Sequence, residues 1–501
     1  MPTDRLRRLA RNPWFWLVAV ALGLRLATLG LYPLIDTTEA RYAELARKMV
    51  ETGNWLTPQF DYGVPFWGKP PLSTWLRAIS FEILGINEFA ARLPSWFIAL
   101  GILTLTFRLG RRERGETVAW LATTLLTGSV LFYILSGAVL MDPLMTLGTT
   151  LSMLAFWRAL RGDGRHWGYL VFVGLAIGLM AKGPVAVVLT GLPLFLWLLA
   201  TGRWRDLWRH IPLVSGTLLM LALAVPWYVL AERATPGFLD YFLVGEHWKR
   251  FTEPGWQGDL YGNAHTSPKG KIWIEWLVAA FPLSLALVAG LGALLWRQRG
   301  GAVRALREDW TLYLLCWALS PMLFFTFSGN ILATYVLPGL PATALLVASW
   351  CRPAAPDGPC RRRSLTWLGR ASLGVPLLIL ALLVLKLKYA LPDDFAHNSE
   401  AYLIRAVEQH DPGGSARLYY LYTRPFSAEF YSAGKAREVE NPQRLRDLLG
   451  SPQPIWVAME SAYEKTLPAD LRACLERIGR FGYRVLLRSR PGCRERTGFG
   501  K

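Results

Sequence analysis

Long apolar runs alternate with short polar segments over roughly the first 390 residues of the chain. Most runs approach the roughly 20 residues that cross a bilayer as a helix. In lipid, a helix satisfies all of its own backbone hydrogen bonds. We therefore predict an all-α polytopic membrane protein with about 11 to 13 transmembrane helices. The expected spans lie near 14–34, 89–107, 117–135, 143–160, 167–181, 184–200, 211–230, 272–296, 310–327, 332–350 and 365–388.

Arginine residues gather in every second connecting segment. They occur before residue 12 and then near 108–114, 158–165, 203–209, 297–307 and 352–363. Basic residues favour the cytoplasmic side of a membrane. The pattern therefore predicts a cytoplasmic N-terminus. It places the longer segments 35–88 and 232–271, and everything after residue 389, on the opposite side.

Composition changes after about residue 390. Strand-like runs occupy 417–422, 454–459 and 483–488, and helical stretches lie near 401–409 and 442–449. We predict two domains, a transmembrane domain at 1–390 and a small α/β domain at 391–501 outside the membrane. Cys474 and Cys493 can pair there if the compartment is oxidising.

Bulk composition narrows the class of protein further. The chain is 52% hydrophobic and carries a formal net charge of +19. That charge is divided among short clusters between apolar runs, which is typical of membrane topology rather than nucleic-acid binding. We expect a membrane and lipid partners, and no nucleic acid.

The first external segment opens with four residues suited to chemistry on a charged substrate: Asp36, Glu39, Arg41 and Tyr42. A carboxylate can activate an acceptor and a guanidinium can hold a phosphate. The apolar positions of 39–50 recur at helical spacing, which predicts a helix lying along the membrane surface. In the alternative interpretation, the acidic residues simply cap this helix. Glu44, on the same helix, is expected to contribute little to activity.

Three other positions combine charge with a constrained backbone or a membrane edge. Lys69 precedes two prolines, and a lysine held rigidly there suits a phosphate headgroup. Alternatively, it is an interfacial anchor. Asp142 and Lys182 each interrupt apolar sequence, where an ionisable group often marks a functional cavity. Asp142 could instead cap the helix that Pro143 starts. Tyr335 follows another apolar run and is expected to line the same cavity.

The second external segment holds Glu246, His247, Lys249 and Arg250, and then His265, a set that could form a metal or a phosphate site. Glu246, His247 and His265 are the candidate metal ligands. Two histidines and a carboxylate are an acceptable ligand set for zinc, although their spacing matches no standard pattern. In the alternative interpretation, the two histidines of this loop are not ligands.

Six short segments, taken in order, resemble the C-type membrane glycosyltransferases of the protein mannosyltransferase-like superfamily, particularly the bacterial aminoarabinose transferases that modify lipid A. They are 38–44, 67–70, 140–143, 180–183, 245–251 and 334–335. The resemblance implies a bacterial inner-membrane enzyme that uses an undecaprenyl-phosphate sugar at the periplasmic face.

The resemblance also implies roles for individual residues. Glu39 or Asp36 takes the place of the family's acid near the acceptor. Relatives carry a glutamate directly before the lysine equivalent to Lys69, where it helps to hold a metal beside a histidine like His247. This chain has Gly68 at that position.

Two functions remain at this stage. The first is an inverting glycosyltransferase that moves a sugar to lipid A or another lipid or protein acceptor of the envelope. In it, Arg41, Lys69 and Lys182 hold the lipid phosphate. Glu39, with Asp36 or Asp142, activates the acceptor. The second is a flippase or transporter of a lipid-linked precursor, which should place charges near mid-membrane and often shows inverted repeats. The charges gather in external segments, which favours the enzyme.

Overall fold

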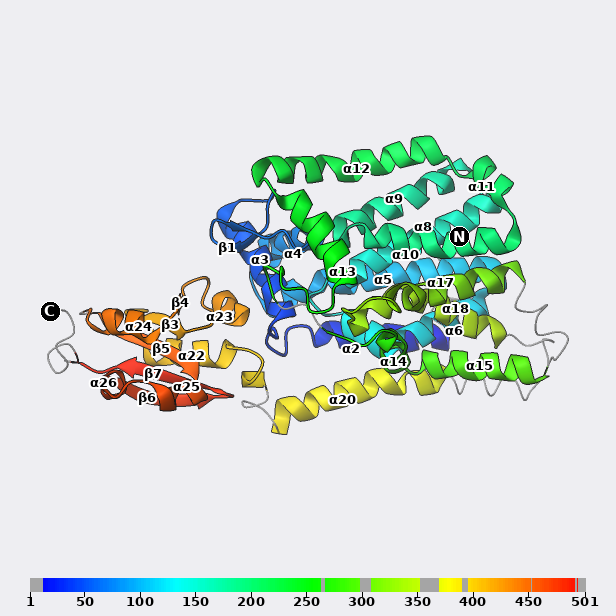
Figure 1. Cartoon of the computed structure of the whole chain (residues 1–501). Coiled ribbons are helices and arrows are strands. Elements are labelled where there is room, and N and C mark those ends of the chain that lie inside the picture. Colours follow the sequence, from blue (N-terminus) through cyan, green and yellow to red (C-terminus); the bar gives the residue numbers. More distant parts are fainter. Residues whose placement is uncertain are drawn as a thin grey trace. The chain divides into compact units, whose positions relative to one another are not determined.

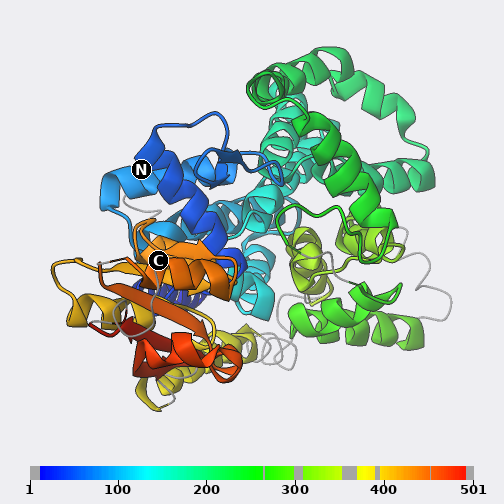
Figure 2. The same cartoon turned by 60° about the vertical axis from the view of Figure 1, so that its left-hand side comes forward.

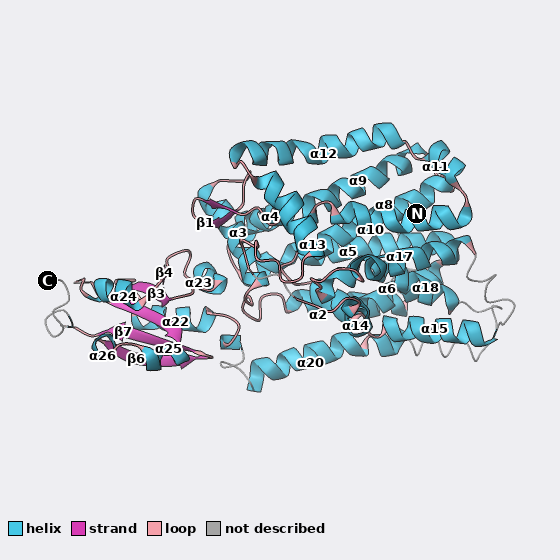
Figure 3. Ribbon diagram, viewed as in Figure 1, coloured by secondary structure: helices cyan, strands magenta, loops and turns pink. Residues whose placement is uncertain are grey.

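The computed structural model describes residues 12–262, 266–297, 308–351, 369–389, 395–451, 453–491 and 493. Helices dominate, and the strands are few (Figure 1, Figure 3). The chain divides into two compact units. The helical unit comprises Met1–Leu29, Lys48–Gly85 and Arg92–Leu380, and the mixed unit comprises Gly30–Arg47, Ile86–Ala91 and Ala381–Lys501. This division differs from a single cut at residue 390, because the mixed unit takes in two segments of the N-terminal part.

Every predicted span contains helix. The elements are α2 (Pro13–Ala27), α5 (Glu88–Arg114), α6 (Glu116–Thr127), α7 (Val130–Leu135), α8 (Asp142–Leu160), α9 (Arg165–Lys182), α10 (Val185–Thr201), α12 (Leu213–Ala234), α14 (Lys271–Ala279), α15 (Leu283–Arg297), α17 (Asp309–Phe325), the 3₁₀ helix η2 (Ala333–Gly339), α18 (Leu340–Trp350) and α20 (Gly374–Tyr389). The predicted class, a predominantly helical protein with several apolar helices, is therefore confirmed.

Among the described residues, four helices are long and apolar enough to cross a membrane, and a fifth span results if the bent pair α14 and α15 is counted as one. The number is below the predicted eleven because several apolar segments are short or broken. The segment 117–135, for example, is split into α6 and α7 at Gly128. A Cβ atom on Gly128 would lie 2.4 Å from the carbonyl oxygen of Ser372.

Burial separates inner from peripheral helices of the helical unit. In the most apolar stretch of α12 only 17% of residues are buried, whereas in the stretch formed by η2 and α18 the share is 72%. Val214 and Leu218 of α12 are largely exposed. Helix α12 runs along the edge of the helical unit in both views (Figure 1, Figure 2). Such a surface is suited to contact with lipid tails.

Small residues bring α8 and α9 together. A Cβ on Gly148 would lie 2.6 Å from the carbonyl oxygen of Gly174, and one on Gly174 would lie 2.3 Å from Ser152 Oγ. Membrane helices pack closely where such small residues meet. This packing matters for the site, because Asp142 begins α8 and Lys182 ends α9.

The connecting segments carry shorter elements. They are α3 (Thr38–Thr52), β1 (Gln59–Asp61), β2 (Val64–Pro65), α4 (Leu72–Leu84), α11 (Trp204–His210), the π-helix η1 (Asp240–Lys249) and α13 (Arg250–Thr252). The prediction that α3 lies along the membrane surface stays a prediction, and several charged residues of α3 are buried. Glu44 and Lys48 are 1% and 0% exposed, and Arg47 binds both carboxylate oxygens of Glu44 at 2.7 Å. Hydrophobic spacing alone does not reveal buried charges that satisfy one another.

The C-terminal part of the mixed unit is a five-stranded sheet with the order β4-β3-β5-β7-β6. Strands β3 (Arg417–Leu421), β4 (Arg437–Val439) and β5 (Ile455–Glu460) are parallel, whereas β6 (Leu475–Phe481) and β7 (Arg484–Ser489) form an antiparallel hairpin beside them. Helices α22 (Ala401–His410), α23 (Phe426–Tyr431), α24 (Pro442–Leu449), α25 (Ser461–Thr466) and α26 (Ala469–Ala473) complete this part. The predicted small sheet domain is confirmed, and Cys474 and Cys493 form a disulfide.

Candidate functional site

Lys69 lies between β2 and α4 of the helical unit and contacts a carboxylate far away in sequence. Its ammonium donates to Glu246 Oε2 at 2.8 Å and to the carbonyl oxygen of Gly68 at 2.6 Å. Glu246 is on η1, and its side chain is only 3% exposed. The predicted phosphate-binding lysine is thus held by a buried anion.

Glu246 is shared with a second cation. Arg250 donates to Glu246 Oε1 at 2.8 Å and lies 3.3 Å from an oxygen of Asp259. Burial opposes ionisation of Glu246, but the charges of Lys69 and Arg250 outweigh it and lower the pKa of this carboxyl to about 2. Glu246 therefore remains an anion at neutral pH, with both of its oxygens engaged.

A second ion pair, similar to that of Lys69 and Glu246, joins α8 and α9. The ammonium of Lys182 donates to Asp142 Oδ1 at 2.6 Å, and Asp142 is 5% exposed. The same ammonium lies 4.5 Å from the centre of the Tyr335 ring, a cation–π contact. The structure therefore brings together three residues that the sequence analysis singled out separately.

His247 connects the two ion pairs. Its Nδ1 lies 2.7 Å from the carbonyl oxygen of Phe242, and its Nε2 lies 3.2 Å from that of Lys182. Burial and the charge of Lys69 lower the pKa of His247 to about 4, so the ring is neutral at pH 7. Gly183 makes room for it: a Cβ there would lie 2.9 Å from His247 Nε2.

We refer to these groups together as the paired-cation cluster. It comprises Lys69, Lys182 and Arg250 with Glu246, Asp142 and Asp259, and each cation lies within 3.3 Å of a carboxylate oxygen. Sequence reasoning placed Arg250 in a segment that could form a metal or a phosphate site, but it did not identify Asp259 as a member. The i,i+4 spacing of Glu246 and Arg250 is consistent with their pairing. Asp259 comes from a loop, and no local pattern reveals it.

The remaining predicted residues belong to the mixed unit. Asp36 accepts hydrogen bonds from the backbone N–H of Ser427, at 3.0 Å, and from its hydroxyl group. Glu39 is in the first turn of α3 and accepts from the backbone N–H of Ile35 at 3.3 Å. Asp36 therefore takes part in a tertiary contact, while Glu39 makes the local contact that the capping interpretation describes.

Arg41 and Tyr42 follow on α3. The guanidinium of Arg41 lies 5.3 Å from the Tyr42 ring and 5.7 Å from the Phe426 ring. Tyr42 is buried, with 6% exposed. In the mixed unit, therefore, Arg41 is placed against aromatic rings.

A second group of charged side chains, in the mixed unit, contains two carboxylates but one arginine. Glu400 lies 2.7 Å from Arg484 and accepts from the hydroxyl of Tyr420 at 3.1 Å. The backbone N–H of Glu400 donates to Ser427 Oγ at 2.9 Å, the same hydroxyl that Asp36 binds. We call Asp36, Ser427, Glu400, Tyr420 and Arg484 the shared-arginine cluster. Burial raises the pKa of Asp36 to about 6 and that of Glu400 to about 7, against the charge of Arg484.

The predicted metal ligands do not fit a metal site in the part of the chain that the structure describes. No group of three or more histidine, cysteine, aspartate or glutamate side chains is placed there to hold an ion. Both oxygens of Glu246 bind cations, and both nitrogens of His247 face carbonyl oxygens. His265, the third predicted ligand, lies outside the described residues.

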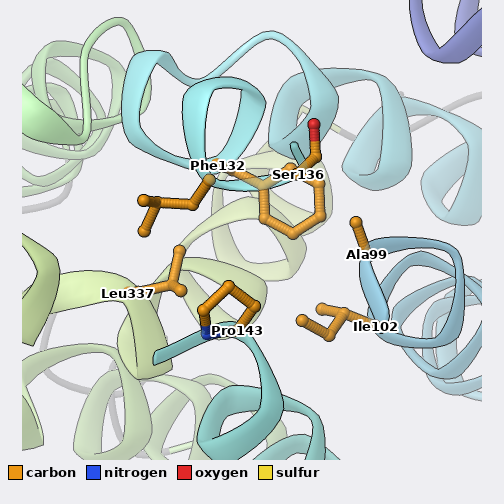
Figure 4. A pocket seen from close by; sticks show the side chains of 7 residues that line it. Ala99, Ile102, Phe132, Ser136, Pro143 and Leu337 are labelled. Atoms are coloured by element: carbon orange, nitrogen blue, oxygen red, sulfur yellow. The ribbon is translucent and has the colours of Figure 1, made fainter. Parts of the chain in front are cut away.

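One pocket close to α8 is apolar rather than charged. It is lined by Ala99, Ile102, Phe132, Leu135, Ser136, Pro143 and Leu337 (Figure 4). It is too narrow to admit a water molecule. It reflects imperfect packing among α5, α7, α8 and η2, and we assign it no ligand.

Comparison with known proteins gives a consistent result. The family model described as dolichyl-phosphate-mannose-protein mannosyltransferase matches residues 13–242. A protein of Enterobacter sp. (strain 638), named undecaprenyl phosphate-alpha-4-amino-4-deoxy-L-arabinose arabinosyl transferase, is 33% identical over 65% of this chain and 57% of its own length. A protein of the same name from Aeromonas salmonicida is 30% identical over 74% of this chain and 65% of its own length. The predicted resemblance is confirmed. The match spans little more than half the length of the first of these aminoarabinose transferases.

The fold agrees with a solved aminoarabinose transferase structure over nearly its full length. The crystal structure of ArnT from Cupriavidus metallidurans bound to undecaprenyl phosphate superimposes with a TM-score of 0.73, covering 95% of this chain and 98% of that one at 20% identity. The apo structure gives a TM-score of 0.74. At this identity the match establishes a shared fold, which includes both the helical part and the C-terminal sheet.

Proposed function

We propose that this protein is an inverting glycosyltransferase that moves a sugar from an undecaprenyl-phosphate donor to lipid A or another envelope acceptor. The observation that carries the proposal is the paired-cation cluster. Lys69, Lys182 and Arg250, from three separate segments, are held in one region of an apolar helical unit. The names of the sequence relatives and of the matched structure point to the same lipid phosphate.

The cluster suggests how the donor is activated. Breaking the bond between sugar and phosphate leaves negative charge on the phosphate oxygens, and fixed cations stabilise that charge in the transition state. Lys69 and Arg250 have donor groups beyond those that bind Glu246, whereas Lys182 presents its charge beside Tyr335. We assign these four residues to the phosphate.

Glu39 is our first candidate for the group that orients or deprotonates the acceptor, and Arg41 and Tyr42 are assigned to substrate binding beside it. Asp142 already accepts from Lys182, and Asp36 already accepts from Ser427. Each of these two carboxylates is thus already engaged by a partner that fixes its position. We therefore propose that Asp142 orients Lys182 and that Asp36 orders the start of α3.

For topology, we propose about eleven spans with the N-terminus in the cytoplasm and the C-terminal domain in the periplasm. The alternation of arginine-rich segments supports this orientation, and the disulfide between Cys474 and Cys493 suits an oxidising compartment. A reporter fused after residue 389 should be active only on the periplasmic side. A cytoplasmic signal would overturn the proposed orientation.

The decisive experiment is a transfer assay with purified protein. Mass spectrometry of lipid A and of other envelope glycans, from cells with and without the protein, identifies the sugar and the acceptor. The purified protein should then release undecaprenyl phosphate from the matching donor. If the protein instead moves the intact donor across vesicle membranes without cleaving it, the transporter interpretation is correct.

A further inference from the structure

We propose that this protein binds its donor phosphate without a metal ion, and that Glu246 acts as a positioning residue that holds Lys69 and Arg250 where a metal would otherwise be needed. The inference rests on the proposed function and deepens it. It assigns a role to a buried carboxylate, Glu246, which the sequence analysis named as a candidate metal ligand.

Glu246 is bound from two directions by cations of different origin. Lys69 comes from the loop before α4 and contacts Oε2, whereas Arg250, one helical turn beyond Glu246, contacts Oε1. The Glu246 side chain is 3% exposed, compared with 17% for Lys69 and 22% for Arg250. The anion is thus enclosed, and the two cations are the more accessible groups.

The two cations retain unused donors after Glu246 is satisfied. An ammonium group has three N–H donors, and Lys69 donates to Glu246 and to the carbonyl oxygen of Gly68. The Nε of Arg250 is buried and has no hydrogen-bond partner among the described residues. An unpaired buried donor is costly, and a phosphate oxygen would satisfy it. The site is therefore incomplete without an anion.

The same geometry is unfavourable to a cation. Any metal at Glu246 would have to displace Lys69 or Arg250, each bound at 2.8 Å. Gly68 provides no side-chain ligand, and a Cβ there would lie 2.8 Å from the Phe66 ring. His247 sits beside positive charge and has a carbonyl oxygen near each ring nitrogen. Two amino-acid cations on one carboxylate thus occupy the space that a metal would require.

The first test measures metal directly. The full-length protein, purified in detergent, is assayed for bound zinc and other divalent metals by mass spectrometry, and for donor cleavage with and without a chelator. We expect much less than one metal per chain and a rate unchanged within about twofold. Stoichiometric metal, with activity lost to the chelator and restored by zinc, would overturn the metal-free centre but leave the proposed function standing. If no donor is cleaved under any condition, the proposed function fails, and binding of undecaprenyl phosphate in the presence of chelator still tests the inference.

The second test separates positioning from simple structural support. Affinity for undecaprenyl phosphate is measured for Glu246→Gln, Lys69→Ala and the double variant. If Glu246 acts through the two cations, each single change should weaken binding about tenfold, and the double variant should lose clearly less than the product of the two losses. Glu246→Asp should recover part of the affinity, because it retains the charge.

The matched control is Glu275→Gln, which removes a partly exposed i,i+4 partner of Lys271 in the same unit. It should leave the affinity unchanged. Independent, multiplicative losses for Glu246→Gln and Lys69→Ala, or full affinity in Glu246→Gln, would refute the positioning role of Glu246.

Discussion

The two charged clusters of this protein differ in how their carboxylates are balanced. In the paired-cation cluster three cations are matched by three carboxylates, and the pKa of Glu246 is lowered to about 2. In the shared-arginine cluster Asp36 and Glu400 depend on one guanidinium, that of Arg484, and the pKa of each carboxyl is raised.

The comparison shows that carboxylates and basic side chains can have different roles, which depend on their relative numbers. Where cations match the carboxylates in number, the carboxylates hold the basic groups in place, and the remaining donors suit an anionic ligand. Where carboxylates outnumber the cation, burial disfavours their charged forms, and protonation becomes part of the stability of the unit. Both clusters are buried, so burial alone does not tell whether a group of charged residues is a binding site or a structural contact.

The largest expected effect comes from a carboxylate that belongs to neither cluster. Glu39→Gln should reduce donor turnover by a factor of about 10² to 10⁴, because the change preserves size and removes a base or charge partner. Glu51→Gln is the control, since Glu51 is an exposed residue of the same helix whose carboxylate accepts a hydrogen bond from the Tyr62 hydroxyl. The measurement is donor turnover by the two purified variants. Equal activity of the Glu39 and Glu51 variants would contradict the role of Glu39 and make Asp36 or Asp142 the better candidate for activating the acceptor.

Removal of a cation from the paired-cation cluster should have the next largest effect. We expect Lys69→Ala to lower turnover about 10²- to 10³-fold, as is typical when one group that stabilises transition-state charge is lost. Lys271→Ala, which removes an exposed lysine paired with Glu275, should have almost no effect. Both variants should insert and purify normally. Near-normal turnover of the Lys69 variant would mean that Lys69 is only an interfacial anchor.

The buried ion pair of Arg47 and Glu44 tests how much the pairing of opposite charges contributes to stability. Arg47 binds Glu44 with two hydrogen bonds inside the mixed unit, and both side chains are almost fully buried. Breaking such a pair by Glu44→Gln should cost about 3–5 kcal/mol, because it leaves a buried guanidinium without its anion. A lower thermal unfolding midpoint in detergent is the measurement. An unchanged midpoint would show that the pair of Glu44 and Arg47 contributes little to stability.

The smallest expected effect is on the pH dependence of stability. The folded pKa values of Asp36 and Glu400, about 6 and about 7, exceed the ordinary values of 3.8 and 4.5. The folded state therefore binds protons more tightly, so stability from these groups is complete below pH 3.8 and is lost as pH rises through 6 to 7.

Thermal unfolding midpoints measured from pH 5 to pH 8 should accordingly fall by a few degrees for the mixed unit. Glu400→Gln should flatten this dependence, whereas Glu464→Gln, which removes a more exposed partner of Arg477, should leave it unchanged. A slope that is identical in both variants would show that other groups control it.

Sequence reasoning located the helices and strands well because each carries its own periodic signal. All predicted spans contain helix, and the strands at 417–421, 455–460 and 484–489 were predicted to within one residue. Strands β4 and β6 were missed: β4 has three residues, and β6 carries Glu476, Arg477 and Arg480 among only seven residues. Breaks within apolar segments were also missed, since Gly128 is required by packing rather than by its neighbours in sequence.

For the site, local sequence identified the chemical groups but not their partners. Lys69 was singled out by its prolines, and Lys182 by its apolar surroundings. Their carboxylates lie 177 and 40 residues away. Asp36 appeared equivalent to Glu39 because the two are neighbours in sequence. The structure distinguishes them, since only Asp36 binds Ser427 in the C-terminal part of the chain.

That last contact has a consequence for biosynthesis. Ser427 is 391 residues beyond Asp36 in the sequence. During synthesis, the segment at the start of α3 therefore has no Ser427 to bind until most of the chain has been made. At roughly 5–20 residues per second the interval is on the order of 20 to 80 seconds. During that time Asp36 is a carboxylate exposed to solvent, and the segment that carries Glu39 is not fixed. A nascent or truncated chain that ends before residue 427 is therefore expected to be inserted but idle, and activity begins only when the C-terminal sheet has folded.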